Sequence, residues 1–395
     1  MSSIKQGYKQ TKVGIIPEDW EVVKLNDIFT KSFYGTSEST NEIGKYPVLR
    51  MGNMQNGTLI INDLAYIDLE DKEFKKYQLK KGDILLNRTN SYELVGKISL
   101  FDLDEDFISA SYIVAYRPNQ KILNSIFINN LLNTTYFQEK IKTLATKGVS
   151  QANINPTAFK EVIKIPLPPL KEQEKIAEIL TTWDEAISLH VKLIEEKEQL
   201  KIGLMQKLLS GEVRFAGFCD EWEEVKLGEI CKITTGKLNA NAMVENGKYT
   251  FFTCARETYK IDKFAFDTEA LLVSGNGANV GYIHYFKGKF NAYQRTYVLD
   301  GFEHNIYLIK YLLDKYLSLQ ISREKNEGNT PYITLPTLTQ MKLKLPSFSE
   351  QQKIAEVLSL ADDELNLLKK ELEELKQQKK GLMQKLLTGE VRVKV

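Results

Sequence analysis

The sequence contains few of the residues from which metal and redox sites are built. It has three cysteines and three histidines in 395 residues. Cys219, Cys231 and Cys254 show no CxxC spacing, and the chain has no HxxxH pair and no Cys/His cluster. A zinc ribbon, a disulfide framework and a metal-dependent active site are therefore not predicted, and the cysteines are expected to be reduced thiols.

Long apolar runs and an excess of charge of one sign are missing too. No run approaches the ~18 apolar residues of a membrane span, so we expect a cytoplasmic protein without a membrane partner. The formal net charge is +1, with 18 basic against 17 acidic residues in 20–165 and 16 against 13 in 222–345. Any attraction to DNA phosphates must come from local clustering or from a partner subunit, so the isolated chain is expected to bind DNA weakly.

The signatures of cofactor-dependent catalysis are also absent. The chain has no GxxxxGK[ST] loop, no GxSxG elbow and no Asn/Asp-Pro-Pro-aromatic tetrapeptide. Gly275, Gly277 and Gly281 form a GxGxxxG run, but the strand-like YIHYF follows it where a dinucleotide site needs a helix. We therefore expect no catalytic residue and no cofactor in this chain.

What the sequence does contain is one stretch written twice. GLMQKLLSGEVRF, residues 203–215, returns as GLMQKLLTGEVRV at 381–393, and 25 of the 44 positions in 171–214 are identical at this offset of 178 residues. A second echo, DWEVVKLNDI at 19–28 and EWEEVKLGEI at 221–230, has an offset of 202. The chain therefore consists of a variable block followed by a constant segment, twice.

The constant segment has the period of a coiled-coil helix, with apolar residues spaced alternately by four and three. The first copy places His190, Lys197 and Lys201 at seam positions. Taken by itself, it therefore forms a weaker coiled-coil seam than the second copy. The predicted seam residues are Ile176, Leu180, Trp183 and Ile187 in the first copy, and Ile354, Leu358, Leu365, Leu368, Leu372 and Leu375 in the second.

A helix of about 38 residues is roughly 57 Å long, too long to bury its stripe against a small domain. The two seams are therefore expected to face each other. The predicted fold is α+β, with two mixed, mostly β domains separated by two long antiparallel helices that form a coiled coil. The expected boundaries are 1–165 for the first domain, 166–214 for the first helix, 215–345 for the second domain and 346–395 for the second helix.

Each variable block combines strand candidates with polar loops. In the first block, 46–51, 59–67 and 82–89 resemble half-buried strands, and 124–144 resembles one amphipathic helix. The second block repeats this plan, with a helix expected at about 305–322. Its loops at 234–249 and 327–336 and its stretch SGNGANVGYIHYF at 274–286 differ in sequence from the corresponding parts of the first block.

With this plan in view, the sequence resembles the specificity subunit of type I restriction-modification systems over essentially its whole length. The motifs that carry the resemblance are IPEDWEVVKL, IPLPPLKEQEKIAEIL, GLMQKLLSGEVRF with EWEEVKLGEI, and LPSFSEQQKIAEVL through GLMQKLLTGEVR. The resemblance implies that each variable block is a target recognition domain for one half of a split site in double-stranded DNA. It also implies that the helices space the domains and dock two modification (methyltransferase) subunits, which bind S-adenosylmethionine. The resemblance further implies that restriction (translocase and nuclease) subunits, which use ATP and Mg²⁺, would join the complex.

Base edges are read by hydrogen bonds, with Arg suited to guanine and Asn or Gln to adenine, whereas phosphate contacts position the protein. The polar loops supply such side chains, although Asn, Ser and Gly in loops also form turns. The candidate DNA-contacting residues are Arg88, Asn90, Ser91, Tyr92, Lys97, Lys147, Gln151 and Asn153 in the first block, and Lys237, Asn239, Asn276, Asn279, Arg295 and Tyr332 in the second.

Two other classes of protein remain open from the residues alone. One is a self-contained restriction or modification enzyme, against which the missing motifs argue. The other is a coiled-coil adaptor whose variable blocks bind proteins and not DNA. Near the helix ends, Leu204, Met205 and Leu208 and their counterparts Leu382, Met383 and Leu386 suit either a bundle core or a docking surface for a methyltransferase helix.

Overall fold

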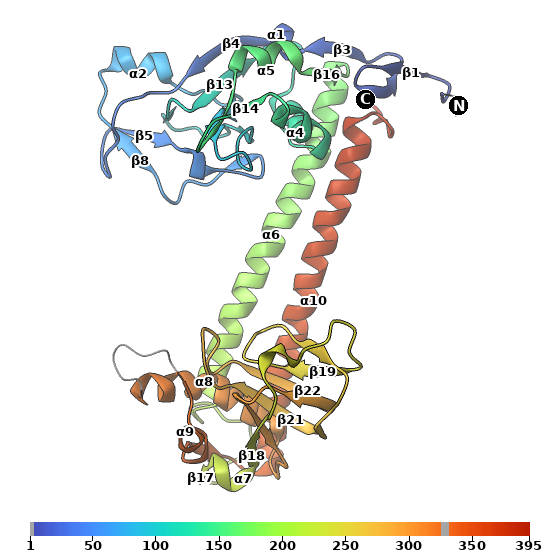
Figure 1. The fold of residues 1–395 in the computed structure, drawn as a ribbon. Helices are drawn as coiled ribbons and strands as arrows, with labels where there is room; N and C mark the ends of the chain where they lie inside the picture. Colours follow the sequence, from blue (N-terminus) through green and yellow to red (C-terminus); the bar gives the residue numbers. More distant parts are fainter. Residues whose placement is uncertain (1–3, 325–331) are drawn as a thin grey trace. The chain divides into compact units, whose positions relative to one another are not determined.

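The computed structural model describes residues 4–324 and 332–395, which form two compact units. Unit 1 consists of residues up to Leu189 together with Leu372–Val395, and unit 2 is His190–Glu371. Each unit contains one β-rich domain and one half of each long helix, α6 (Leu170–Leu208) and α10 (Phe348–Leu387) (Figure 1). The predicted α+β class is confirmed. The compact units divide both helices, and the domain boundaries expected from the sequence stay a prediction.

The domain of unit 1 is built on an antiparallel four-stranded sheet in the order β11-β9-β13-β4, beside a three-stranded sheet in the order β12-β5-β8. A hairpin, two short sheets and a β3–β16 pair complete it. The strands are β1 (Tyr8–Thr11), β2 (Gly14–Pro17), β3 (Glu21–Lys24), β4 (Phe29–Tyr34), β5 (Tyr46–Leu49), β6 (Met54–Gln55), β7 (Thr58–Leu59), β8 (Ala65–Ile67), β9 (Ile84–Asn87), β10 (Thr89–Asn90), β11 (Ile98–Leu100), β12 (Ile108–Ser109), β13 (Ile113–Pro118), β14 (Ala145–Lys147), β15 (Ala152–Ile154) and β16 (Lys164–Leu167).

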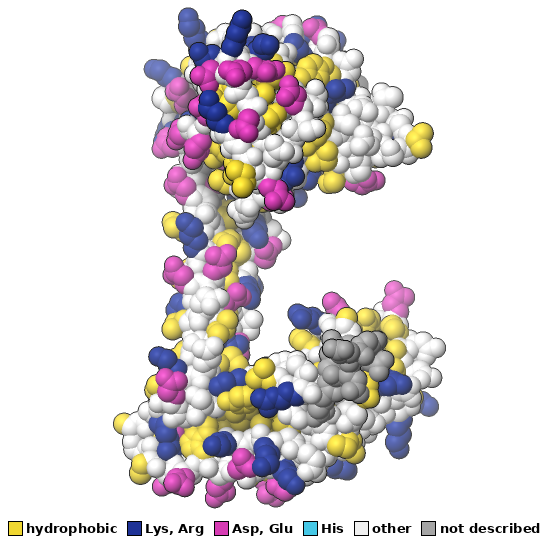
Figure 2. Space-filling model, turned by 90° about the vertical axis from the view of Figure 1, so that its left-hand side faces the viewer, with side chains coloured by type: hydrophobic (Ala, Val, Ile, Leu, Met, Phe, Trp, Pro, Cys, Tyr) yellow, Lys and Arg dark blue, Asp and Glu magenta, His cyan; other side chains and the backbone are white. Residues whose placement is uncertain are grey.

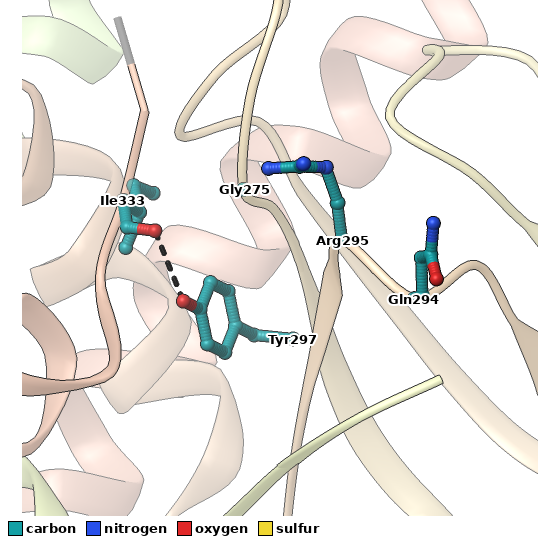
Figure 3. A pocket seen from close by; sticks show the side chains of 5 residues that line it. All are labelled: Gly275, Gln294, Arg295, Tyr297 and Ile333. Atoms are coloured by element: carbon teal, nitrogen blue, oxygen red, sulfur yellow. Dashed lines mark hydrogen bonds between the residues drawn. The ribbon is translucent and has the colours of Figure 1, made fainter. Parts of the chain in front are cut away.

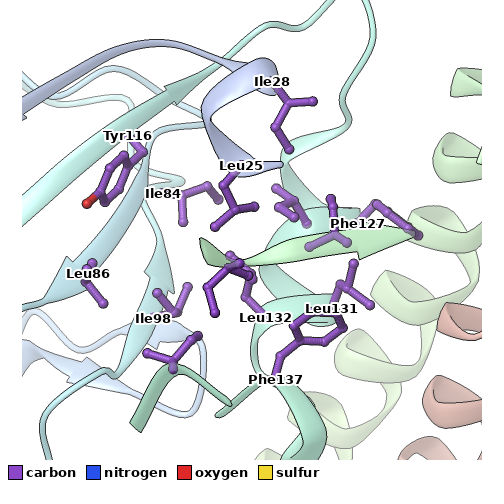
Figure 4. Close-up of a cluster of buried hydrophobic side chains, with 14 of the residues drawn as sticks. Leu25, Ile28, Ile84, Leu86, Ile98, Tyr116, Phe127, Leu131, Leu132 and Phe137 are labelled. Carbon is purple, nitrogen blue, oxygen red and sulfur yellow. The ribbon is translucent and has the colours of Figure 1, made fainter. Parts of the chain in front are cut away.

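The main core of unit 1 lies between the four-stranded sheet and the helices. Ile84, Leu86 and Ile98 of the sheet pack against Leu131 and Phe137, and all of them are buried (Figure 4). The helices of this domain are α1 (Leu25–Ile28), α2 (Asp71–Tyr77), α3 (Ser125–Leu132), α4 (Thr135–Lys142) and α5 (Pro156–Val162), with a 3₁₀ turn η1 (Met51–Asn53).

The domain of unit 2 has one six-stranded sheet in the order β18-β23-β21-β22-β19-β20, and a separate β17–β24 pair. Its strands are β17 (Glu223–Lys226), β18 (Lys232–Thr235), β19 (Tyr249–Phe252), β20 (Tyr259–Ile261), β21 (Phe266–Ser274), β22 (Ile283–Ala292), β23 (Thr296–Asp300) and β24 (Lys342–Leu345). Its helices are α7 (Leu227–Ile230), α8 (Ile306–Glu324) and α9 (Leu335–Thr339), with a 3₁₀ turn η2 (Ala240–Ala242).

The two domains share one plan, and a single interruption accounts for the difference between their sheets. In unit 2, β22 pairs antiparallel with β21 and parallel with β19, which joins β18, β23 and β21 to β19 and β20 in one six-stranded sheet. In unit 1 the same two pairings belong to separate strands, β11 with β9 and β12 with β5. The acidic segment DLDED at 102–106 stands between those strands. Asp and Glu are poor strand formers, so the sheet divides there.

The amphipathic helix expected over 124–144 is wrong, because the structure has two helices there, α3 and α4. The Asn133 amide donates to the carbonyl oxygen of Asn129 at 2.9 Å, and the Thr134 hydroxyl donates to that of Leu131 at 2.8 Å. These side chains compete for the carbonyls that a continuing helix would use, and so end it. The helix expected at about 305–322 is confirmed as α8, which is continuous.

The two long helices pack along the predicted seam within each unit, and every seam residue is buried or half-buried. The pairs run antiparallel. In unit 2, His190 hydrogen-bonds the carbonyl oxygen of Leu368 at 2.9 Å, Lys197 pairs with Glu364 at 2.5 Å, and Lys201 pairs with Asp362. The polar seam residues of α6 therefore have partners on α10, and the pairing continues through them.

The ends of the long helices are fastened by the repeated GEVR segments. In unit 2, Arg214 makes two hydrogen bonds, of 2.6 and 2.9 Å, to the fully buried carboxylate of Glu350 in the first turn of α10. In unit 1, Arg392 binds Glu172 in the first turn of α6, and the Trp20 indole N–H donates to the same carboxylate at 3.0 Å. Arg392 also hydrogen-bonds Asp19, which holds the pKa of that carboxyl below its usual value.

Within the described ranges, the structure has no helix that is both long and apolar enough to cross a membrane.

We predict that shortening one seam residue destabilises the protein far more than shortening its exposed neighbour. Leu358 is fully buried and Leu360 is 61% exposed on the same helix. Leu358→Ala should lower the free energy of unfolding by about 2–5 kcal/mol, since it leaves a cavity, whereas Leu360→Ala should change it by less than about 0.5 kcal/mol. Urea denaturation followed by circular dichroism measures both. Equal effects would contradict the seam.

Candidate nucleic-acid interface

In unit 1, two polar loops meet where the central strand β9 ends. The Arg88 N–H donates to the carbonyl oxygen of Tyr112 at 3.0 Å, and the carbonyl of Arg88 accepts from the Ile154 N–H at 2.8 Å. Strand β10 then pairs with β15, with Thr89 opposite Asn153. The segments 88–97 and 147–153, which are far apart in sequence, therefore lie side by side.

Unit 2 contains the same junction at the end of β21. The Gly275 N–H donates to the carbonyl oxygen of Arg295 at 2.9 Å, and the carbonyl of Gly275 accepts from the Ile333 N–H at 2.8 Å. An antiparallel bridge joins Asn276 to Tyr332. The loop at 275–282 therefore lies beside the residues that lead into α9. Residues 327–331 of the loop expected at 327–336 lie outside the described residues.

One glycine in each domain allows this junction to form. Ideal Cβ atoms at Gly35 and Gly236 would lie only 1.8 Å from the carbonyl oxygens of Ser109 and Ala292. No other residue type fits such a close approach of two backbones. In both domains this glycine follows the first strand of the main sheet, as Gly35 after β4 and Gly236 after β18.

The structure brings most of the candidate residues of unit 1 together. The Lys147 ammonium lies 4.0 Å from the centre of the Tyr92 ring, and the Thr89 hydroxyl donates to Asn153 Oδ1 at 2.6 Å. The Asn90 side chain accepts from the Ser91 N–H at 2.8 Å. These residues present rings, amides and a lysine on one surface.

An acidic residue and an exposed glutamine complete this surface. The backbone N–H and the Ser91 hydroxyl, with nearby Lys142 and Lys147, hold the pKa of Glu93 below its usual value. Gln151 is exposed at the hairpin between β14 and β15.

Lys97 is the exception among the unit 1 candidates. It lines a groove of about 970 Å³ whose walls include Ile15, Phe137, Met383 and Leu387. The groove also carries Lys376, Lys379 and Lys380 from α10.

The candidate residues of unit 2 surround its junction. Asn239 Oδ1 accepts from the Gln294 amide at 3.1 Å, and the Asn279 amide donates to the carbonyl oxygen of Cys254 at 3.1 Å. Tyr332 is 58% exposed, and Lys237 is exposed as well. The position of Asn276 is fixed by its bridge to Tyr332.

A pocket of about 320 Å³ opens at this junction, lined by Gly275, Gln294, Arg295, Tyr297 and Ile333 (Figure 3). The Tyr297 hydroxyl donates to the carbonyl oxygen of Ile333 at 2.9 Å and forms one wall. Sequence reasoning identified Arg295 but missed Gln294 and Tyr297. It also missed Tyr34 in unit 1, whose ring centre lies 5.5 Å from the Arg88 guanidinium. Tyr34 and Tyr297 belong to strands β4 and β23, and Gln294 lies in the turn before β23; the sequence places none of these segments beside the loops.

Both junctions contain a fully buried polar side chain that has no partner among the described residues. Within 4–324 and 332–395, the amide of Asn87 at the end of β9 and the hydroxyl of Ser274 at the end of β21 make no hydrogen bond. The two residues occupy equivalent positions, one residue before Arg88 and Gly275. A desolvated polar group without a partner is costly, so the two junctions share a local source of instability.

The described part of the chain has no group of three or more His, Cys, Asp or Glu residues that could hold a metal ion. Each histidine has a structural partner. His190 binds the carbonyl of Leu368, His304 lies 3.0 Å from the Gln351 amide, and His284 bonds the carbonyl of Ala255 at 3.1 Å. Burial lowers the pKa of His284, which favours the neutral ring at neutral pH.

Comparison with known proteins gives consistent matches along the chain. A family model described as the type I restriction modification DNA specificity domain matches residues 17–199 and 219–377. The putative type I restriction enzyme MjaX specificity subunit of Methanocaldococcus jannaschii is 30% identical over 423 residues, which cover 99% of this chain and 98% of that protein. The type I restriction enzyme EcoDI specificity subunit of Escherichia coli is 41% identical over 169 residues, 42% of this chain and 37% of that protein.

Solved structures share the fold. A type I restriction-modification S subunit from M. genitalium matches with a TM-score of 0.63 at 22% identity, over 93% of this chain and 96% of that one. The HsdS subunit from Thermoanaerobacter tengcongensis matches with a TM-score of 0.52 at 19% identity, over 95% and 98%.

We predict opposite effects on stability for two substitutions at the unit 2 junction. Ser274→Ala removes an unpaired buried hydroxyl and should raise the free energy of unfolding by up to about 1 kcal/mol. Thr334 caps α9, since its hydroxyl oxygen accepts from the Thr337 N–H, so Thr334→Ala should lower that free energy by about 1 kcal/mol. Denaturant unfolding measures both. A destabilised Ser274→Ala variant would mean that the hydroxyl has a partner.

Proposed function

Because this chain belongs to the family of type I restriction-modification DNA specificity subunits, we propose that its two target recognition domains each read one half of a bipartite sequence in double-stranded DNA. The family supplies specificity and not catalysis. One observation carries the proposal. In each domain, two polar loops meet at an equivalent junction at the end of the corresponding strand, β9 or β21. The sequences of these loops differ between the two domains.

Reading would use the side chains around each junction. In unit 1 these are the exposed Tyr92, Gln151 and Asn153 and the half-buried Arg88 and Asn90, which offer donors, acceptors and a ring to base edges in the major groove. Lys147 is placed to contact phosphates beside them, which positions the domain without selecting a base. In unit 2, Asn239, Asn276, Asn279, Arg295 and Tyr332 would have the first role and Lys237 the second.

The long helices would set the gap between the half-sites and carry the docking sites for two methyltransferase subunits. Leu208 and Leu386 are buried in the cores, while Leu204, Met205, Leu382 and Met383 are half-buried. Met383 also lines the groove of unit 1, whose apolar walls and lysines suit an apolar helix with acidic flanks.

The complex would work in the cytoplasm with its chemistry in other subunits. The methyltransferase subunits would bind S-adenosylmethionine, and restriction subunits would use ATP and Mg²⁺. Basic and acidic side chains intermingle over the visible surface of both units (Figure 2). That distribution supports weak DNA binding by the isolated chain and stronger binding by the assembled complex.

The alternative function is a coiled-coil adaptor whose blocks bind proteins. Paired helices with variable domains would suit it, but it gives no reason for polar loops at the same junction in both domains.

The proposal predicts a split methylation motif that depends on this chain. Co-expression with the adenine methyltransferase encoded beside it, followed by single-molecule sequencing of the host genome, should map N6-methyladenine to two half-sites with a fixed gap. The motif should vanish when this chain is omitted. An unsplit motif that survives the omission would favour the adaptor.

A second prediction concerns the gap. Inserting four helical residues into both α6 and α10 adds about 6 Å to each, close to two base pairs at ~3.4 Å per step. The recognised gap should lengthen by about two base pairs while both half-sites keep their sequence. The same methylation mapping reads out both properties, and a changed half-site would refute the spacer role of the helices.

A further inference from the structure

At each junction two backbone segments face each other, and the arginine stands on a different one of these two segments in each domain. The residue after the central strand is Arg88 in unit 1 and Gly275 in unit 2. The backbone N–H of Arg88 donates to the carbonyl oxygen of Tyr112, and the backbone N–H of Gly275 donates to the carbonyl oxygen of Arg295. Each domain therefore has one arginine at its junction, on one or the other of two facing backbone positions.

This exchange of the arginine between the two segments coincides with the pocket of unit 2. A Cβ at Gly275 would lie 2.4 Å from the carbonyl oxygen of Arg295 and 3.0 Å from the nearest atom of the Tyr297 ring, so no side chain fits at this position in unit 2. In unit 1 the equivalent position holds the Arg88 side chain. In unit 2, Gly275 lines the pocket together with Arg295, whose guanidinium points toward Gly275 (Figure 3).

Neither guanidinium is used by the fold. Among the described residues, no hydrogen bond or ion pair reaches the side chain of Arg88 or Arg295, and the Nε of Arg88 is buried without a partner. By contrast, Arg117, Arg214 and Arg392 are committed to Asp83, Glu350 and Glu172. The Tyr34 ring under Arg88 and the Tyr297 wall beside Arg295 limit where each fork can point.

A planar guanidinium with free, directed N–H groups matches a pair of acceptors in one plane. In the major groove, guanine presents this pair as O6 and N7, and an arginine fork on them is the commonest base-specific contact. We propose that Arg88 and Arg295 are the guanine-specifying residues of their domains, each requiring one G·C pair in its own half-site. This inference rests on the proposed function, and it assigns one specified G·C pair to each half-site and one arginine that reads it.

The test compares methylation motifs made by the full complex with the methyltransferase subunits. Arg88→Ala should relax one G·C position in one half-site only, and Arg295→Ala one G·C position in the other half only. At the relaxed position, methylation of sites with a different base should rise by about 10- to 100-fold relative to the cognate site. Each variant serves as the control for the half-site that it should leave unchanged.

Two further arginines are matched controls. Arg50 is ion-paired with Asp63 in unit 1. Arg256 lies over the ring of Tyr282, at the end of the 275–282 loop in unit 2, and is the competing arginine of that domain. Arg50→Ala and Arg256→Ala should leave the motif intact. Arg88→Lys and Arg295→Lys keep the charge but lose the fork, so they should relax the same positions as the alanine variants. If an alanine variant fails to assemble, the lysine variants still test whether each arginine specifies a guanine.

Several outcomes would overturn the inference. Uniformly weaker methylation with an unchanged motif would identify a phosphate contact. A motif changed by Arg256→Ala and not by Arg295→Ala would assign the role to Arg256, and two variants that alter the same half-site would break the assignment by domain. If the wild-type complex produces no split motif, the proposed function fails. If it does and all four Arg88 and Arg295 variants retain it, only this inference fails.

Discussion

The fold depends on pairing two buried carboxylates with arginines from the repeated GEVR segments. Glu350 is fully buried and Glu172 nearly so, and an ionised carboxylate at such a position is tolerated only with a hydrogen-bonded cation. Arg214, just beyond the end of α6, pairs with the start of α10, and Arg392, beyond the end of α10, pairs with the start of α6. Each contact joins a helix end, a helix start and a domain, which explains why this stretch of sequence is written twice while the blocks between the copies differ.

Because the segments that flank each domain are held in this way, the loops of a domain can differ in sequence while its strands keep the same pairing. The β3–β16 and β17–β24 pairs close the two blocks in the same register, Lys24 opposite Lys164 and Lys226 opposite Lys342. Inside the blocks, Gly35 and Gly236 make tight backbone contacts close to the two junctions. The flanking strand pairs and these contacts support each domain, and we propose that the loops provide selectivity. Asn87 and Ser274, which are buried without a partner among the described residues, are a local cost.

Much of this organisation could be predicted from the sequence because repetition and periodicity are local signals. The seam from Ile354 to Leu375 and the two-block plan follow from spacing alone, and the structure confirms them. Features that depend on partners distant in sequence could not be predicted. The stop between α3 and α4 depends on Asn133 and Thr134, whose side chains bind helix carbonyls. The polar seam residues of α6 pair with residues of α10 that lie far away in the sequence. For the candidate site, the sequence predicted the polar loops, whereas Tyr34 of β4, Tyr297 of β23 and Gln294, in the turn before β23, lie beside these loops only in the fold.

The most direct test of the central claim is to replace residues 227–341 by 25–163 of the same chain, because the strand pairs that flank the two blocks have the same register. Methylation mapping of the resulting complex should give a motif that contains the first domain's half-site twice and lacks the second domain's half-site. A motif that still contains the second half-site would show that selectivity resides outside the exchanged block, and would contradict the account.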